Sequence, residues 1–215
     1  MMLVRTAVTG TDVALERAAA CIAAGGTLIF PTETVYGIGA APEDEAAIAR
    51  IYGAKGRVAD KPLALHVADI DQALPFVAEW TVCAQAAADL FWPGPLAIIV
   101  SRRPGRFECA AAGFATISIR RPSHTLCRAM LQESGPIAAT SANRSGRDAF
   151  VGDEPGVSLL PQATLAILDG PTEFRAESTI VDCTGSAPKI VRSGAIAASV
   201  VAEKLGALAS ASPSL

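Results

Sequence analysis

Residues 27–37 read TLIFPTETVYG, an apolar run that changes at Pro31 into hydroxyls, a carboxylate and an aromatic ring. The run 27–30 has the length and composition of a buried strand. In open α/β sheets, ligands bind beyond the ends of strands, where loops expose polar groups. Because two threonines flank Glu33, the segment indicates a small-ligand pocket, although an ordinary β-turn also explains the proline and the threonines.

Helix and strand patterns alternate on both sides of this segment, and Pro42 with three following acids is typical of a helix start. The strands 96–100 and 116–120 are close enough in sequence to pair antiparallel. The order predicts an α/β fold, with an open, twisted, mixed sheet and flanking helices. Helices are predicted at 11–24, 42–53, 81–91, 123–133 and 195–205, and further strands at 63–67, 137–140, 164–168 and 179–182.

The composition predicts a single domain over residues 1–215, with a frayed tail at 207–215. The 51 % of apolar and 18 % of charged residues allow a sizeable core. No signal-peptide pattern and no run of about 18 apolar residues occurs, so we expect a cytoplasmic protein without membrane contact. The five cysteines are widely spaced and only two histidines are present, so the pattern favours neither a disulfide framework nor a metal site.

The net charge of -3 is unevenly distributed along the chain. Residues 50–147 hold 12 lysines and arginines against 7 acidic residues, a local +5, whereas the two flanks hold 6 against 14, or -8. Cations gathered on a concave surface attract phosphates, so this asymmetry indicates that the central segment handles an anion. Basic residues scattered over solvated faces would give the same count.

Lys55, Arg57 and Lys61 lie close together after the predicted helix that ends near Gly53. Lysine and arginine are the donors that a polyphosphate requires, and an anion would relieve their mutual repulsion. The chain has no GxxxxGK[ST] loop, so any phosphate site must be built from side chains. A solvated basic loop remains the alternative.

Two further strands end in polar side chains. The strand 116–120 ends at Arg120, whose guanidinium can bind a carboxylate or a phosphate through two hydrogen bonds. The strand 137–140 runs into Ser141 and Asn143, which would point to the same side of an extended backbone. A proline turn and an Asx turn, respectively, are the structural alternatives.

Taken together, these segments resemble the threonylcarbamoyl-adenylate synthase family, which has the YrdC-like domain. The resemblance covers roughly residues 15–196 and is closest to the short, single-domain branch of the family. Each motif alone has little specificity, but their common order is very specific. The matching motifs are PTETVYGIGA (31–40), KGR (55–57), DKPLALHV (60–67), WPGPLAIIV (92–100), ISIRRPSH (117–124), GPIAATSANRSG (135–146), STIVDCTG (178–185) and IVRSGAI (190–196).

The resemblance implies a twisted sheet that encloses a large, concave, basic cavity. It also implies a nucleotidyltransferase that condenses L-threonine, bicarbonate and ATP into threonylcarbamoyl-adenylate and pyrophosphate, with Mg²⁺ accompanying ATP. The expected partners are the threonylcarbamoyl-transferase proteins that modify tRNA, and tRNA or double-stranded RNA itself. The alternative is an RNA-binding YrdC-like paralogue without synthase activity.

The same resemblance implies roles for individual residues. The expected catalytic residues are Lys55, Arg57, Ser141 and Asn143. ATP binding is expected at Lys55, Arg57, Lys61, Thr116, Asn143 and Arg192, and threonine binding at Thr34, His66, Arg120, Ser141 and Ser178. The sequence departs from the family pattern at Val58, where a proline is frequent, and at Ala149-Phe150, where small hydroxylated residues and proline are frequent.

Overall fold

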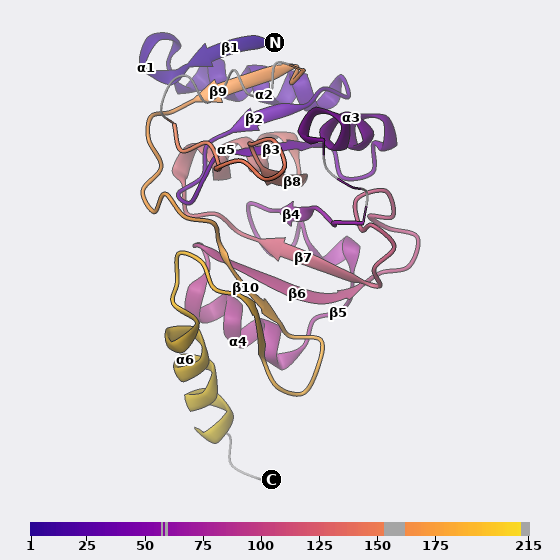
Figure 1. Cartoon of the computed structure of the whole chain (residues 1–215), viewed down its shortest axis with the longest axis vertical. Coiled ribbons are helices and arrows are strands. Elements are labelled where there is room, and N and C mark those ends of the chain that lie inside the picture. The colour runs from indigo at the N-terminus through magenta and orange to yellow at the C-terminus, as the bar shows by residue number, and fades with distance from the viewer. Residues whose placement is uncertain (57, 59, 153–161, 212–215) are drawn as a thin grey trace.

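The computed structural model in Figure 1 describes residues 1–56, 58, 60–152 and 162–211. Helical segments alternate with strands along most of the chain. The helices are α1 (Thr6–Thr9), α2 (Thr11–Ala23), α3 (Glu45–Lys55), the 3-10 turn η1 (Leu74–Phe76), α4 (Val82–Phe91), α5 (Thr125–Ser134) and α6 (Ala198–Ala211). The strands are β1 (Met2–Arg5), β2 (Leu28–Phe30), β3 (Gly37–Ala40), β4 (Ala64–His66), β5 (Val77–Glu79), β6 (Leu96–Arg102), β7 (Thr116–Arg120), β8 (Ile137–Ser141), β9 (Leu165–Leu168), β10 (Thr179–Asp182) and β11 (Lys189–Arg192).

The described strands form one mixed sheet in the order β1-β9-β2-β3-β8-β4-β7-β6-β10-β11, and β5 pairs with β6. The parallel pairs are β1–β9, β9–β2, β4–β7 and β6–β10. The remaining pairs, among them β6–β7, are antiparallel. The predicted α/β class with an open, mixed, twisted sheet is therefore confirmed.

The elements predicted from apolar runs all occur, with boundaries shifted by a few residues. The short strands β1, β3, β5 and β11 and the single helical turns α1 and η1 were not predicted from the sequence. Strand β3 has the sequence GIGA, which lacks the β-branched run that marks a strand. Helix α6 continues to Ala211, so the predicted frayed tail at 207–215 overlaps it, and 212–215 lie outside the described residues.

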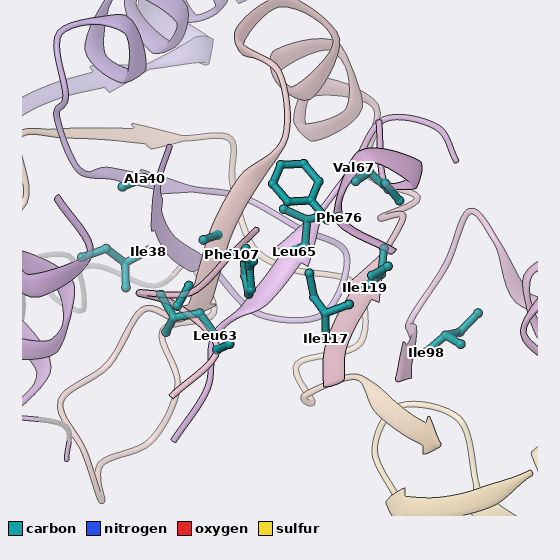
Figure 2. Close-up of a cluster of buried hydrophobic side chains, with 14 of the residues drawn as sticks. Ile38, Ala40, Leu63, Leu65, Val67, Phe76, Ile98, Phe107, Ile117 and Ile119 are labelled. Carbon is teal, nitrogen blue, oxygen red and sulfur yellow. The ribbon is translucent and has the colours of Figure 1, made fainter. Parts of the chain in front are cut away.

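Alternation along the central strands divides the core between the two faces of the sheet. Leu28 and Phe30 pack with α2 and α5, whereas Ile29 between them packs into the larger cluster with α3 and α4. In the same way Ile137 belongs to the first cluster and Ala138 to the second. Figure 2 shows part of the larger cluster, which lies over strands β4, β6 and β7.

Local signals fix the ends of the helices that flank the sheet. Asp44 caps α3 by accepting a hydrogen bond from the amide of Ala47 at 2.9 Å, and Gly56 ends this helix with a left-handed φ of 58°. Thr81 caps α4 by accepting a hydrogen bond from the amide of Ala84 at 3.1 Å. Among the described residues, none of the helices has both the length and the apolarity that a bilayer crossing requires.

Candidate active site

A cavity of about 370 Å³ lies over the central strands of the sheet. Its floor consists of side chains that are neighbours across the strands. One row is Ala139, Ala64, Ser118 and Ile99, and the next row is His66, Arg120, Ala97 and Ile180.

The small residues of this floor leave space for a ligand above the sheet. The residues between them along the strands, such as Leu65, Ile98 and Ile119, point to the opposite face and belong to the core (Figure 2). The same alternation thus gives one packed face and one hollow face.

Arg120 is the buried cation of the cavity floor. Its Nη2 donates a hydrogen bond to Oε1 of Glu33 at 2.8 Å, and the two residues are only 5 % and 2 % exposed. Burial alone would raise the pKa of Glu33, but the charge and the hydrogen bond of Arg120, together with backbone hydrogen bonds, outweigh burial and hold this pKa below its usual range. A guanidinium has five N–H donors, so Arg120 can bind a ligand oxygen while it holds Glu33.

His66 lies beside Arg120 in the same row and is also buried. Burial, together with the positive charge of Arg120, lowers the pKa of His66 to about 3. Its ring meets the ring of Phe30 edge-on, with 5.8 Å between the centroids. At neutral pH the imidazole is therefore uncharged and offers a ligand one donor or one acceptor without repelling Arg120.

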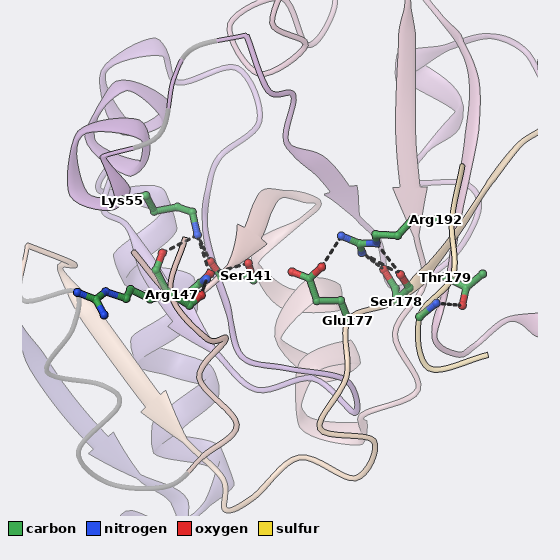
Figure 3. Close-up of polar contacts among 9 residues, drawn as sticks. Lys55, Ser141, Arg147, Glu177, Ser178, Thr179 and Arg192 are labelled. Atoms are coloured by element: carbon green, nitrogen blue, oxygen red, sulfur yellow. Dashed lines mark hydrogen bonds and ion pairs between the residues drawn. The ribbon is translucent and has the colours of Figure 1, made fainter. Parts of the chain in front are cut away.

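A second polar cluster joins the end of α3 to the loop after β8 (Figure 3). Lys55 is 3 % exposed, and its Nζ donates to the carbonyl of Ser141, to the carbonyl of Asn143 at 2.7 Å and to Oδ1 of Asn143 at 3.0 Å. Ser141 Oγ donates to the same Oδ1 at 2.7 Å. The amide of Ser145 adds a bond to the carbonyl of Lys55 at 2.9 Å. Lys55 therefore anchors the loop that carries Ser141 and Asn143.

The opposite side of the cavity holds a third cluster, which Figure 3 also shows. Arg192 in β11 donates from Nη1 to Oε2 of Glu177 at 2.5 Å. Its Nη2 donates to the carbonyl of Ser178 at 2.8 Å and to the hydroxyl of Ser178 at 3.3 Å. Arg192 and Glu177 are about two-fifths exposed, so solvent weakens this ion pair and a more highly charged anion can compete for the arginine.

The loop 31–36 closes the cavity beside β3. Thr32 lines the cavity, and its hydroxyl lies 2.8 Å from the hydroxyl of Thr34 and donates to the carbonyl of Val35 at 2.6 Å. The hydroxyl of Tyr36 donates to the carbonyl of Gly170 at 2.7 Å and accepts from the amide of Asp169 at 2.9 Å. Burial raises the pKa of Tyr36 to about 12, so this tyrosine stays protonated and anchors the loop.

Comparison with known proteins agrees with this geometry. The Sua5/YciO/YrdC family, described as "Telomere recombination", matches residues 20–194. The chain belongs to this family.

Two curated relatives in this family carry related names. The threonylcarbamoyl-AMP synthase of Bacillus subtilis (strain 168) is 39 % identical over 188 residues, which are 86 % of this chain and 54 % of that protein. The putative threonylcarbamoyl-AMP synthase of Mycobacterium tuberculosis (strain H37Rv) is 37 % identical over 190 residues, which are 88 % of each chain. The chain thus spans about half the length of the first relative and most of the second.

A solved structure from the same family resembles the fold closely. The crystal structure of P. abyssi Sua5 complexed with L-threonine has a TM-score of 0.88 and 33 % sequence identity. The likeness covers 95 % of this chain and 60 % of that chain.

The family motifs bring most of the predicted site residues together. Lys55 and Asn143 adjoin the cavity through Ser141, and Thr34 lies behind Thr32. Arg57 lies outside the described residues. The predicted residues that line the cavity are Lys61, His66, Arg120, Ser141, Ser178 and Arg192.

Four predicted residues that the structure describes do not line the cavity themselves: Thr34, Lys55, Thr116 and Asn143. Thr116 pairs with Ser101 at the start of β7, and Ser118, two residues further along the same face of the strand, lines the cavity instead. The sequence shows that Thr116 and Ser118 lie on the same face of the strand, but it does not show which of the two lies over the cavity. The functional role of every residue at the site remains a prediction.

No role was predicted from the sequence for two acidic residues of the site, Glu33 and Glu177. Glu33 stands in the PTETVYG motif, and its flanking threonines indicated a pocket, but its pairing with Arg120 spans 87 positions of sequence. Glu177 is an isolated acid before β10, and no local pattern marks it as the partner of Arg192.

Proposed function

We propose that this chain is an L-threonylcarbamoyladenylate synthase of the nucleotidyltransferase class, which makes threonylcarbamoyl-AMP and pyrophosphate from L-threonine, bicarbonate and ATP. The observation that carries the proposal is the cavity floor, where a buried arginine and a neutral histidine lie next to small residues. The fold likeness to a Sua5 structure that contains L-threonine supports it.

In this proposal, threonine binds over the row of the floor that contains His66, Arg120 and Ala97. Arg120 pairs with the amino-acid carboxylate, while Glu33 holds the guanidinium in position. His66 and Ser178 supply uncharged hydrogen-bonding groups, which suit a hydroxyl and an amine.

The nucleotide then lies between the two outer clusters. Lys61 and Arg192 line the cavity at its exposed side, where they can meet phosphate oxygens. Asn143, fixed by Lys55, supplies an amide beside them, while Ser141, whose hydroxyl donates to Oδ1 of this amide, is a proposed contact to threonine. Arg192 also contacts the hydroxyl of Ser178, so one residue adjoins both proposed subsites.

The chemistry requires positioning rather than a protein nucleophile. The threonine amine adds to bicarbonate with loss of water, and an oxygen of the resulting carbamate attacks the α-phosphorus of ATP. Pyrophosphate leaves as negative charge builds on it, and the lysine and arginine side chains stabilise that charge. Holding the two reactants in line lowers the entropic part of the barrier.

Magnesium fits this arrangement as an ion that arrives with ATP. Among the described residues, no group of three histidine, cysteine or acidic side chains is placed to hold a metal. Glu177 is the acidic residue among those that line the cavity, so it can supply one carboxylate oxygen. Because Mg²⁺ is usually held by substrate phosphates and one or two carboxylates, this donor set suits it. When bound, the ion would neutralise charge on the leaving pyrophosphate.

The product is a reactive mixed anhydride, so a further protein must consume it. We propose that threonylcarbamoyl-transferase proteins in the cytoplasm transfer the group to tRNA. The central basic segment would favour contact with tRNA, because phosphate backbones bind lysine and arginine without regard to sequence.

The test is pyrophosphate release by the purified chain with ATP, Mg²⁺, bicarbonate and threonine, with mass detection of threonylcarbamoyl-AMP. We expect release to depend on both threonine and bicarbonate, and Arg120→Gln to raise the threonine KM by at least about tenfold. Release that is unchanged without threonine would contradict the proposal. RNA binding without any pyrophosphate release would favour the RNA-binding paralogue.

A further inference from the structure

Two cysteines lie in contact on the side of the sheet covered by α4, away from the residues that line the cavity. The Sγ atoms of Cys83 and Cys183 are 2.7 Å apart, although 100 positions separate the two residues in sequence. A disulfide bond is about 2.05 Å long, so about 0.7 Å of approach would bring the sulfurs to bonding distance. In the structure both residues are free thiols.

The backbone around the two thiols already holds them together. Cys83 is in the first turn of α4, and Thr81, which caps this helix, donates from Oγ1 to the carbonyl of Cys183 at 2.9 Å. Cys183 directly follows β10, and its amide donates to the carbonyl of Ile99 in β6 at 2.9 Å. Cys83 is thus placed by the helix that carries it, and Cys183 by two hydrogen bonds to its backbone groups.

The two thiols differ in their access to solvent. Cys83 is half-buried and lines a surface depression of about 310 Å³, together with Val82 and residues 184–186. Cys183 is fully buried, and burial together with the neighbouring Cys83 raises the pKa of its thiol. An oxidant in solution therefore meets Cys83 first. Among the described residues, Cys183 is the only cysteine in contact with Cys83.

We propose that Cys83 and Cys183 form an oxidation site, at which a peroxide converts the two thiols into an intramolecular disulfide. The sulfur of Cys83 attacks one peroxide oxygen, which gives a sulfenic acid and releases the first water or alcohol. The sulfur of Cys183 then attacks the sulfenic sulfur, and its hydroxyl leaves with a proton as water. The two thiols lose two electrons and two protons in total, and the peroxide O–O bond takes up both electrons.

The bond would enclose a part of the chain that carries about half of the residues lining the cavity. The loop from Cys83 to Cys183 contains β6, β7 and β8, and with them Arg120, Ser141 and Asn143. A cross-link that closes a loop of this length restricts the unfolded chain strongly. The oxidised protein should therefore melt about 4–15 °C above the reduced protein.

The test uses the full-length reduced protein and hydrogen peroxide, followed by alkylation of the remaining thiols and peptide mass spectrometry. We expect the loss of two hydrogens, one cross-linked peptide pair that contains residues 83 and 183, and alkylation of Cys21, Cys109 and Cys127 as before. Dithiothreitol should return the melting temperature to that of the reduced protein.

Two variants keep the test specific. Cys83→Ser should lose both the cross-link and the rise in melting temperature, whereas Cys109→Ser, a second half-buried cysteine, should keep both. Oxidation of Cys83 to a sulfinic acid without a cross-link would overturn the proposal. So would a cross-link between any other pair, or five alkylated cysteines after peroxide treatment of the wild-type chain.

Discussion

His66 and Arg120 form a pair of neighbours on the cavity floor that carries one positive charge rather than two. An exposed histidine would titrate near pH 6.5, but the folded protein keeps His66 neutral until about pH 3. Between these values the unfolded chain binds a proton that the folded chain does not. His66 therefore contributes stability that is fully present above pH 6.5 and is lost as the pH falls toward 3.

The low pKa of His66 in the folded protein predicts that the free energy of unfolding depends on pH, and that His66→Gln removes this dependence. Relative to pH 8, wild-type protein should lose about 2 kcal/mol of stability at pH 5 through His66, and His66→Gln should lack this loss. Urea unfolding at both pH values measures the free energies. The ring signal of His66 in NMR spectra, assigned with the same variant, should not shift between pH 8 and pH 5. A titration midpoint near 6.5 would show that the ring is not held neutral.

Glu33 and Glu43 offer a comparison between a buried and an exposed ion pair. Glu33 pairs with Arg120 at 2.8 Å with both side chains buried, whereas Glu43 pairs with Arg106 at 2.6 Å with both side chains more than a third exposed. Glu33→Gln leaves a buried charge without its counterion and should cost about 3 kcal/mol. Glu43→Gln should cost less than about 1 kcal/mol. Chemical denaturation gives both values, and equal losses would contradict the burial argument.

Strand β3 shows how closely two strands pack beside the cavity. A Cβ atom added at Gly39 would lie 2.4 Å from Cγ2 of Ile137 and 2.8 Å from the carbonyl oxygen of Ala138. Gly39→Ala should therefore destabilise the protein by about 2 kcal/mol or more, because β3 and β8 must move apart. Gly53→Ala is the matched control in α3, where a Cβ meets no atom within 4 Å. It should stabilise the helix by about 0.5–1 kcal/mol. Thermal unfolding of both variants distinguishes crowding from a general effect of adding a methyl group.

The loop after β8 depends on a lysine from another element. Lys55→Met would remove the cation that holds the carbonyls of Ser141 and Asn143. We expect a stability loss of about 3 kcal/mol and a fall in kcat of at least about tenfold, because the loop loses its position. Lys61→Met is the control, since Lys61 is exposed at the cavity; it should raise the ATP KM and leave the melting temperature nearly unchanged. A drop in stability for Lys61→Met equal to that for Lys55→Met would contradict this division of roles.

The elements differ in how much of them the sequence could predict. Strand β6 was found from its continuous apolar run, and β7 from its alternation of apolar and polar residues. Strand β3 was missed because its glycines serve close packing against β8 rather than strand propensity. The motifs named most of the residues that meet at the cavity. They could not name Glu33 or Glu177 as partners of arginines, because such pairs depend on register and on contacts distant in sequence.

Over the whole molecule, one alternation of side chains builds both the core and the cavity. Large apolar residues on one face of β4, β6 and β7 pack against the helices. Alanine, serine and arginine on the other face line the cavity. Only some of the basic residues of the segment 50–147 line the cavity. Lys61 and Arg120 from the central segment line the cavity, but Arg192 comes from the acidic C-terminal flank, and Arg106 pairs with Glu43 elsewhere. The overall charge pattern therefore indicated an anion site without locating it.

This distribution of charge predicts that salt weakens the binding of ATP more than the binding of threonine. ATP carries several negative charges, and its proposed partners Lys61 and Arg192 line the exposed side of the cavity, where ions screen attraction. Threonine has no net charge, and its proposed partner Arg120 is buried, so salt screens that contact less. Raising the ionic strength from about 0.05 to about 0.5 M should raise the ATP KM about fivefold and the threonine KM less than about twofold. Steady-state pyrophosphate release measures both constants, and Arg192→Gln should show a weaker dependence of the ATP KM on salt. Equal increases for the two substrates would mean that they do not occupy exposed and buried parts of one cavity.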